Sequence, residues 1–193
     1  MKTITLASTS KFKSEILSRV GLPHVCMVST SKEQSKLKNP YEYVMELANM
    51  KAKSIKDKAS TNIVLGLDTI VLTNDKIIEK PSSLDQAKQN LLDSRENHSL
   101  VITGICLINK DTGQIINTYQ ETKIYFKDIV NEDIDFYLNN EPDIMYASGF
   151  IIENIASNFI DKIEGSYYNI LGCPVEKIYE ILNKMDLYLK DFH

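Results

Sequence analysis

The stretch that most limits the possible folds is a nearly continuous apolar run, "NIVLGLDTIVLT" at residues 62–73. The run is rich in β-branched residues and is bounded by polar segments, which favours a strand buried on both faces. Strand-like and helix-like segments interleave along the rest of the chain, with one long hairpin. We therefore expect an α/β protein whose mixed, twisted sheet is flanked by helices around a central cleft.

The segments around this run are predicted from periodicity and from capping and turn residues. The predicted strands lie at 3–8, 22–31, 62–73, 76–79, 99–109 and 114–126, with two more short ones within 147–163. Three predicted helices lie at 12–20, 83–92 and 131–140, and a Ser83–Gln86 capping box opens the second of them. Two further helices are predicted to begin at Asn39, with Pro40 at the first helical position, and at Pro174.

Length and composition exclude several classes of protein. A chain of 193 residues suits a single domain with a sizeable core, with room for two lobes. A net charge of −4 gives no reason to expect a nucleic-acid or membrane partner. The N-terminal apolar run is too short for a signal peptide, and no apolar segment is long enough to cross a membrane. The three cysteines, with no C-x-x-C pair, suit a reducing cytoplasm and buried structural positions.

Three charged residues stand where the apolar pattern predicts burial or a fixed backbone. Asp68 lies inside the long apolar run, where an ionised carboxylate is costly unless it is paired or bound to a cation. Lys51 lies on the apolar stripe of the second helix, and Lys80 follows a strand and precedes a proline. The alternatives are an aspartate that caps a loop, a lysine that extends to solvent and a surface lysine at a strand end.

The segment "LASTSKFKSEIL" joins the first strand to the first helix through polar and basic residues. Ser8 and Ser10 supply hydroxyl groups, Lys11 and Lys13 supply positive charge, and the helix N-terminus supplies free N–H groups. Together they predict a phosphate site, although Ser10 also serves as an ordinary N-cap. With the Asp68 carboxylate and the two lysines described above, these groups predict attack on a phosphoanhydride that is assisted by a metal ion such as Mg²⁺.

Seven segments in order resemble the Maf (septum-formation inhibitor) family of nucleoside triphosphate pyrophosphatases, which is related in fold to the inosine triphosphatases. The segments span residues 6–174: "LASTSKFKSEIL", "ELANMKA", "LGLDTIV", "IEKP", "HSLVITGI", "YASGF" and "IEGSYYNILGCP". The resemblance implies hydrolysis of a nucleoside triphosphate, canonical or modified, to the monophosphate and pyrophosphate with a divalent cation, Mg²⁺ or Mn²⁺. It also suggests a homodimer.

The resemblance also assigns roles to residues. Asp68 is the implied general base and a metal ligand, and Glu33 is the implied metal or water partner. Lys51 and Lys80 match the catalytic lysines of the family's K-A and K-P motifs. The family's phosphate-binding turn falls on Ser8, Ser10 and Lys13.

Three positions are associated with base specificity in the family, and they fall on Phe12, Thr69 and Glu153. Phe12 and Glu153 resemble the branch that acts on 7-methyl-GTP, whereas Thr69 resembles the dTTP/UTP branch. The phosphate-binding turn departs from the family because it has no proline, and Lys13 stands where the family has arginine. Lysine keeps the charge and loses the bidentate fork of the guanidinium.

Two other functions are compatible with part of the sequence. A catalytically weak Maf-like nucleotide-binding or regulatory protein of cell division is favoured by the lost arginines. It is opposed by the retained Glu33, Lys51, Asp68 and Lys80, because buried charges cost stability when they are unpaired. An RNA- or nucleotide-binding module without chemistry is opposed by the negative net charge.

Overall fold

The computed structural model describes residues 1–148 and 150–193. Its strands are β1 (Ile4–Leu6), β2 (His24–Cys26), β3 (Ile63–Thr73), β4 (Lys76–Ile78), β5 (His98–Asn109), β6 (Ile115–Phe126) and β7 (Ile160–Gly165). They form one sheet of order β2-β1-β3-β5-β6-β7, with β4 paired to β3. Strand β1 is parallel to β2 and β3, whereas β4 is antiparallel to β3 and β7 to β6, so the sheet is mixed as predicted.

The α-helices are α1 (Lys11–Arg19), α2 (Pro40–Ile55), α3 (Leu84–Glu96), α4 (Asn131–Asn140), α5 (Tyr167–Ile170) and α6 (Val175–Lys184). Three short 3-10 helices are η1 (Ile144–Tyr146), η2 (Ile155–Phe159) and η3 (Leu189–Asp191). Within the described residues, no helix is both long enough and apolar enough to span a bilayer. The α/β class predicted from the sequence is confirmed.

Two local predictions need correction. The segment 147–163 was expected to hold two strands, but its described residues contain η2 and only the start of β7; Gly149 of the "YASGF" motif lies outside the described residues. The capping box of α3 is only half formed, since Ser83 Oγ accepts from the N–H of Gln86. The Gln86 amide oxygen instead accepts from the N–H of Ser82 at 2.8 Å.

The chain divides into two compact units. Unit 1 comprises 1–69, 102–120 and 168–193, and unit 2 comprises 70–101 and 121–167. Strands β3, β5 and β6 contribute residues to both units.

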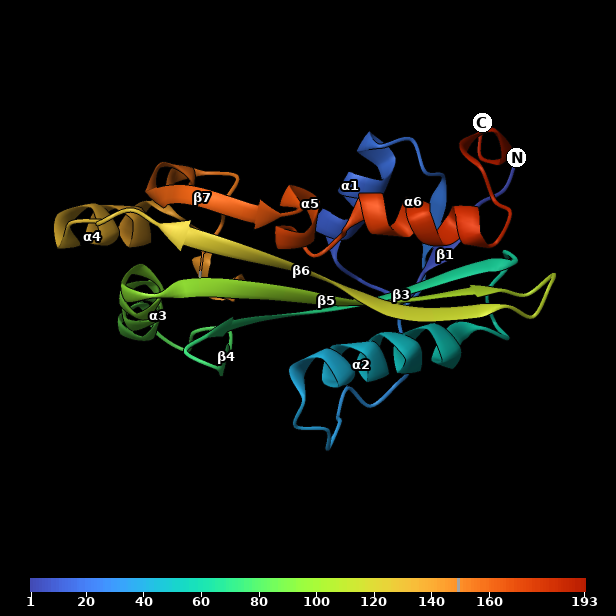
Figure 1. Cartoon of the computed structure of the whole chain (residues 1–193), viewed down its shortest axis with the longest axis horizontal. Coiled ribbons are helices and arrows are strands. Elements are labelled where there is room, and N and C mark those ends of the chain that lie inside the picture. The colour runs from blue at the N-terminus through green and yellow to red at the C-terminus, as the bar shows by residue number, and fades with distance from the viewer. Residues whose placement is uncertain (149) are drawn as a thin grey trace. The chain divides into compact units, whose positions relative to one another are not determined.

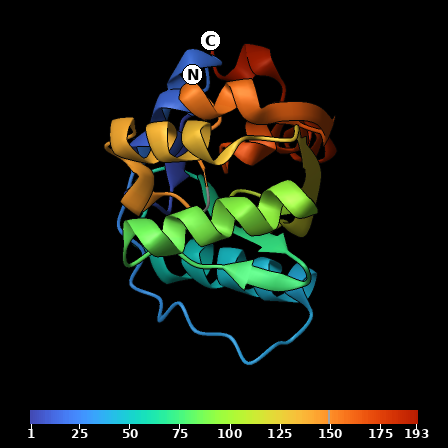
Figure 2. The ribbon, with the colours of Figure 1, turned by 90° about the vertical axis from the view of Figure 1, so that its left-hand side faces the viewer.

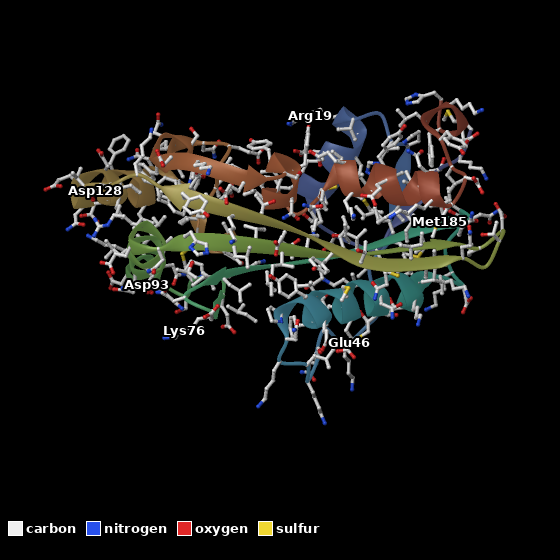
Figure 3. The ribbon with its side chains drawn as sticks, viewed as in Figure 1. Arg19, Glu46, Lys76, Asp93, Asp128 and Met185 are labelled. Carbon is white, nitrogen blue, oxygen red and sulfur yellow. The ribbon has the colours of Figure 1, made fainter. Side chains whose placement is uncertain are left out.

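In unit 1 the sheet is covered on both faces. Figure 1 shows α2 on one face and α1 and α6 on the other, and Figure 3 labels Glu46 of α2 and Met185, just past α6, on these two sides. The core under α1 and α6 is built from large aliphatic residues that include Leu17, Leu65 and Ile181. The core under α2 is built mostly from small residues, among them Ala48, Ala52 and Ala59.

Two glycines bring α2 unusually close to the sheet. A Cβ atom at Gly66 of β3 would lie 2.1 Å from the carbonyl oxygen of Ala48, and one at Gly104 of β5 would lie 2.1 Å from that of Val44. Distances this short would force the helix away from the strands. The absence of side chains at these two positions therefore fixes how closely the side chains of α2 approach β3.

Unit 2 has a core of its own. Helices α3 and α4 pack against each other, as Figure 2 shows. Leu91 of α3 and Ile134 and the fully buried Tyr137 of α4 belong to the core of this unit. The turn of the β3–β4 hairpin has positive φ angles at both central residues, 52° at Asn74 and 58° at Asp75. This is the backbone of a type I′ turn, which matches the twist of the two strands.

Candidate functional site

The turn between β1 and α1 presents backbone and hydroxyl donors together. Ser10 is the N-cap of α1, and its Oγ accepts from the N–H of Lys13 at 3.4 Å. Ser8 Oγ accepts from the N–H of Ser10 at 3.1 Å. Both hydroxyl hydrogens stay available, and no described residue accepts from the N–H groups of Lys11 or Phe12. Such a group of donors at a helix N-terminus suits an anion.

On the first helix, Lys13 extends over the glycine of the "ILGCP" segment. Gly172 has a φ of +74°, and a Cβ atom there would lie 3.2 Å from Lys13 Cε and 3.0 Å from Thr69 Oγ1. The missing side chain thus leaves room for Lys13 and Thr69 beside each other. Thr69 Oγ1 also lies 3.0 Å from the hydroxyl of the fully buried Thr103 on β5.

The carboxylate of Asp68 is paired with Lys51, a pairing that the apolar patterns of the two segments did not specify. Lys51 Nζ lies 2.6 Å from Asp68 Oδ1, and the two side chains are only 13% and 11% exposed. Nζ also lies 3.2 Å from Glu33 Oε2, on a side chain that is 56% exposed. A single ammonium group therefore holds two carboxylates, while Asp68 Oδ2 has no hydrogen bond within the part of the chain that the structure describes.

In unit 1, strand β1 ends before strand β3 reaches Asp68, whose side chain is 11% exposed. Strand β1 pairs with β3 from Ile63 to Leu65, and the last backbone bond runs from the N–H of Ala7 to the carbonyl of Leu65 at 2.8 Å. Strand β3 continues beyond this point, so Asp68 lies three residues past the last β1 partner. The α1 turn begins where β1 stops, which brings the hydroxyl and N–H donors of this turn and the Asp68 carboxylate to the same end of the parallel strands.

Electrostatic interactions connect these side chains and set the charge of both lysines. Burial lowers the pKa of Lys51, but the charge and hydrogen bond of Asp68, followed by those of Glu33, outweigh burial and raise it. Burial also lowers the pKa of Lys13, and the neighbouring Lys51 charge lowers it further, to about 8. The attraction of Asp68, Cys173 and Glu33 offsets these effects only in part. Lys51 thus stays a cation, whereas Lys13, with its pKa of about 8, loses its charge at mildly alkaline pH.

The structure brings most of the predicted site residues together in unit 1, namely Ser8, Ser10, Lys13, Glu33, Lys51, Asp68 and Thr69. Phe12 begins the apolar pattern of α1, yet its side chain is 52% exposed and does not join the core. Lys80, after β4, and Glu153, in the turn before η2, are exposed residues of unit 2. Neither has a hydrogen bond or an ion pair with another described residue.

No local sequence pattern indicated that Glu33 belongs to the candidate site. It lies in a polar loop, where a glutamate is ordinary, and only the family resemblance singled it out. The contact with Lys51 arises because the loop folds back on α2. The prediction of buried structural cysteines is confirmed for Cys106 and Cys173, whose pKa burial raises to about 12, but Cys26 is exposed.

The donor set fits a small divalent cation that also binds phosphates. No cluster of three or more possible metal ligands occurs among the described residues. Mg²⁺, however, takes one or two carboxylates and completes its coordination with water and substrate phosphates. Asp68 and Glu33 are such a pair, since both lie on the ammonium of Lys51.

Known proteins are similar to this chain over nearly its whole length. The family described as Maf-like protein matches residues 3–185. Proteins named dTTP/UTP pyrophosphatase from Thermoanaerobacter sp. (strain X514) and Bacillus cereus (strain G9842) are each 34% identical to the chain. The matches cover 94% and 97% of this chain and 95% and 97% of those proteins. The solved structure of the Staphylococcus aureus Ham1 protein shares the fold, with a TM-score of 0.54, 12% identity and coverage of 95% of this chain and 100% of that one.

Proposed function

Because this chain belongs to the Maf-like protein family, we propose that it hydrolyses a nucleoside triphosphate to the monophosphate and pyrophosphate. The observation that carries the proposal is the buried Asp68 carboxylate, which Lys51 holds through one oxygen while the other remains open. A carboxylate held in this way can accept a proton from a water molecule. The phosphate-binding turn of α1 lies at the same end of the parallel strands.

The reaction follows from these groups. The oxygen of a water molecule forms a bond to the α-phosphorus, and its proton passes to Asp68. The bond from that phosphorus to the bridging oxygen of the β-phosphate breaks, and pyrophosphate leaves with the electron pair. Ser8, Ser10 and the helix N-terminus bind the phosphate oxygens, and Lys13 adds positive charge.

A divalent cation would be held by Asp68 and Glu33, and it would neutralise phosphate charge and help to orient the chain of phosphates. Lys51 keeps the two carboxylates together before the cation arrives. Lys80 is proposed as a catalytic lysine on its match to the family's K-P motif alone. The homodimer and the cytoplasmic location remain predictions.

We propose dTTP and UTP as the preferred substrates. The relatives that match nearly the whole chain are named for these nucleotides. Thr69 and the "SYYN" segment support this choice, because both resemble the dTTP/UTP branch of the family. Phe12 and Glu153 resemble the 7-methyl-GTP branch, so 7-methyl-GTP is the nucleotide whose hydrolysis should be compared with that of dTTP and UTP.

The test is pyrophosphate release with Mg²⁺ or Mn²⁺ from a panel that contains dTTP, UTP, 7-methyl-GTP and the other common triphosphates. We expect release from at least one member, and loss of release in Asp68→Asn. Absence of release from every member would contradict the proposal and favour a nucleotide-binding protein. In Glu153→Gln, we expect the preference among bases to change more than the overall rate; an unchanged profile would remove Glu153 from base recognition.

A further inference from the structure

The loop that carries Glu33 is tied to α2 by hydroxyl groups that the reaction does not use. This loop, residues 27–39, joins β2 to α2 without regular secondary structure, and Figure 2 shows it in light blue at the bottom of the view, next to α2. Ser29, Ser31 and Ser54 form what we term the serine cluster. Ser29 Oγ lies 2.7 Å from Ser31 Oγ and 3.0 Å from Ser54 Oγ, and Ser54 belongs to α2.

Ser54 is the centre of these contacts. Its Oγ accepts from the N–H of Thr30 at 3.2 Å and donates to the carbonyl of Lys51 at 2.8 Å. Thr30 Oγ1 donates to the carbonyl of Ser54 at 3.4 Å. Ser54 thus joins the loop directly to the turn of α2 that carries Lys51.

The number of protons fixes the direction of every bond in the cluster, because each hydroxyl has one hydrogen to donate. Ser54 gives its hydrogen to the carbonyl of Lys51, so Ser29 must be the donor to Ser54. The hydrogen of Ser29 is then used, so Ser31 must be the donor to Ser29, whose Oγ also accepts from the N–H of Ser31. A chain of bonds with one direction therefore runs from the loop to α2, and each bond polarises the next.

This chain of hydrogen bonds ends beside Glu33. Glu33 follows Ser31 by two residues, and its Oε2 lies 3.2 Å from Lys51 Nζ. The Glu33 side chain is 56% exposed, and an ion pair with such exposure is too weak to order a loop by itself. The hydrogen bonds of the serine cluster supply the order that the ion pair lacks.

We propose that Ser54 is a positioning residue that holds Glu33 at the carboxylate site by fixing the loop 27–39 on α2. The inference rests on the proposed function only for the role of Glu33 toward a cation; the fixing of the loop is independent of it. The outer partners that orient a ligand are commonly worth about tenfold or more in metal affinity.

The first experiment does not depend on activity. Lys32, Lys36 and Lys38 are exposed in the loop, so limited trypsin digestion reports its opening. Ser54→Ala should increase the rate of cleavage in the loop several-fold without loss of global stability, because alanine favours the helix. Ser54→Thr keeps the hydroxyl group, so its loop should be cleaved at the rate of the unaltered protein. Ser35→Ala is the matched control, because Ser35 Oγ accepts only from the N–H of Leu37 within the loop.

The second experiment separates positioning of Glu33 from loop order alone. In Ser54→Ala we expect the Mn²⁺ dissociation constant, measured by calorimetry with a non-hydrolysable triphosphate, to rise about tenfold. Glu33→Gln should weaken Mn²⁺ binding as well, and adding Ser54→Ala to Glu33→Gln should have no further effect. An unchanged digestion rate in Ser54→Ala, or additive effects on Mn²⁺ binding, would overturn the inference. Failure of the proposed function alone would appear as absent pyrophosphate release with the accelerated digestion retained.

Discussion

Lys51 Nζ and Asp68 Oδ1 lie 2.6 Å apart, and the two residues come from a helix and a strand that pack face to face. Removing one partner of a buried pair leaves an uncompensated charge, whereas removing both leaves none. We expect Lys51→Met to lower the free energy of unfolding by about 3–5 kcal/mol. We expect the double variant Lys51→Met/Asp68→Leu to recover most of that loss.

Urea denaturation measures the stability of both variants. We also expect both variants to be inactive, and an assay of pyrophosphate release measures this. A double variant as unstable as Lys51→Met would mean that the ion pair is not the source of the instability. Activity in the double variant would remove both residues from the mechanism.

Lys13 is expected to make triphosphate binding sensitive to alkaline pH. Burial and the Lys51 charge lower its pKa to about 8, so the ammonium is charged below this pH and neutral above it. Because the charged form attracts phosphate, affinity for a non-hydrolysable triphosphate should fall by up to about tenfold between pH 7 and pH 9. Lys13→Arg should flatten this dependence, since a guanidinium stays charged throughout. Titration calorimetry across this range is the measurement, and equal slopes in the two proteins would contradict the assignment to Lys13.

Gly172 is expected to matter for the site as well as for the backbone. Gly172 and Gly113 have nearly the same φ, +74° and +75°, so alanine strains both positions alike. A Cβ atom meets nothing within 4 Å at Gly113, but at Gly172 it presses on Thr69 Oγ1 and Lys13 Cε. Both variants should lose similar stability, and only Gly172→Ala should lower kcat/KM, by about tenfold or more. Equal kinetics in the two variants would show that Gly172 serves the turn alone.

Thr103 is expected to influence base selection through Thr69. Its buried hydroxyl lies 3.0 Å from Thr69 Oγ1, so Thr103→Val leaves Thr69 free to turn. We expect the ratio of kcat/KM for dTTP to that for 7-methyl-GTP to change. Thr5→Val is the control, because Thr5 is equally buried and loses a comparable bond, to Thr61 at 2.8 Å. Each variant should lose about 1 kcal/mol of stability, and a changed ratio in both would point to a general effect.

Local chemistry predicted most of the secondary structure. Asn39 and Pro40 placed the start of α2, because Asn39 Oδ1 accepts from the N–H groups of Tyr41 and Glu42 and proline needs no partner at that position. The exception is the segment 147–163, whose short apolar groups suit a strand and a 3-10 turn equally. Its Phe159 and Ala156 are buried against α3 and α4, and this packing decides its conformation.

The sequence by itself placed two opposite charges, Lys51 and Asp68, on apolar faces of an α/β protein, because each interrupts an apolar pattern of regular period, and it left their burial as one of two alternatives. Tertiary structure alone decided that the two charges pair with each other and that Glu33 joins them. That outcome depends on Gly66 and Gly104, which let α2 approach β3, and on the serine cluster, which returns a polar loop to the helix. Distances between segments remote in sequence are set by packing, and no local pattern encodes them.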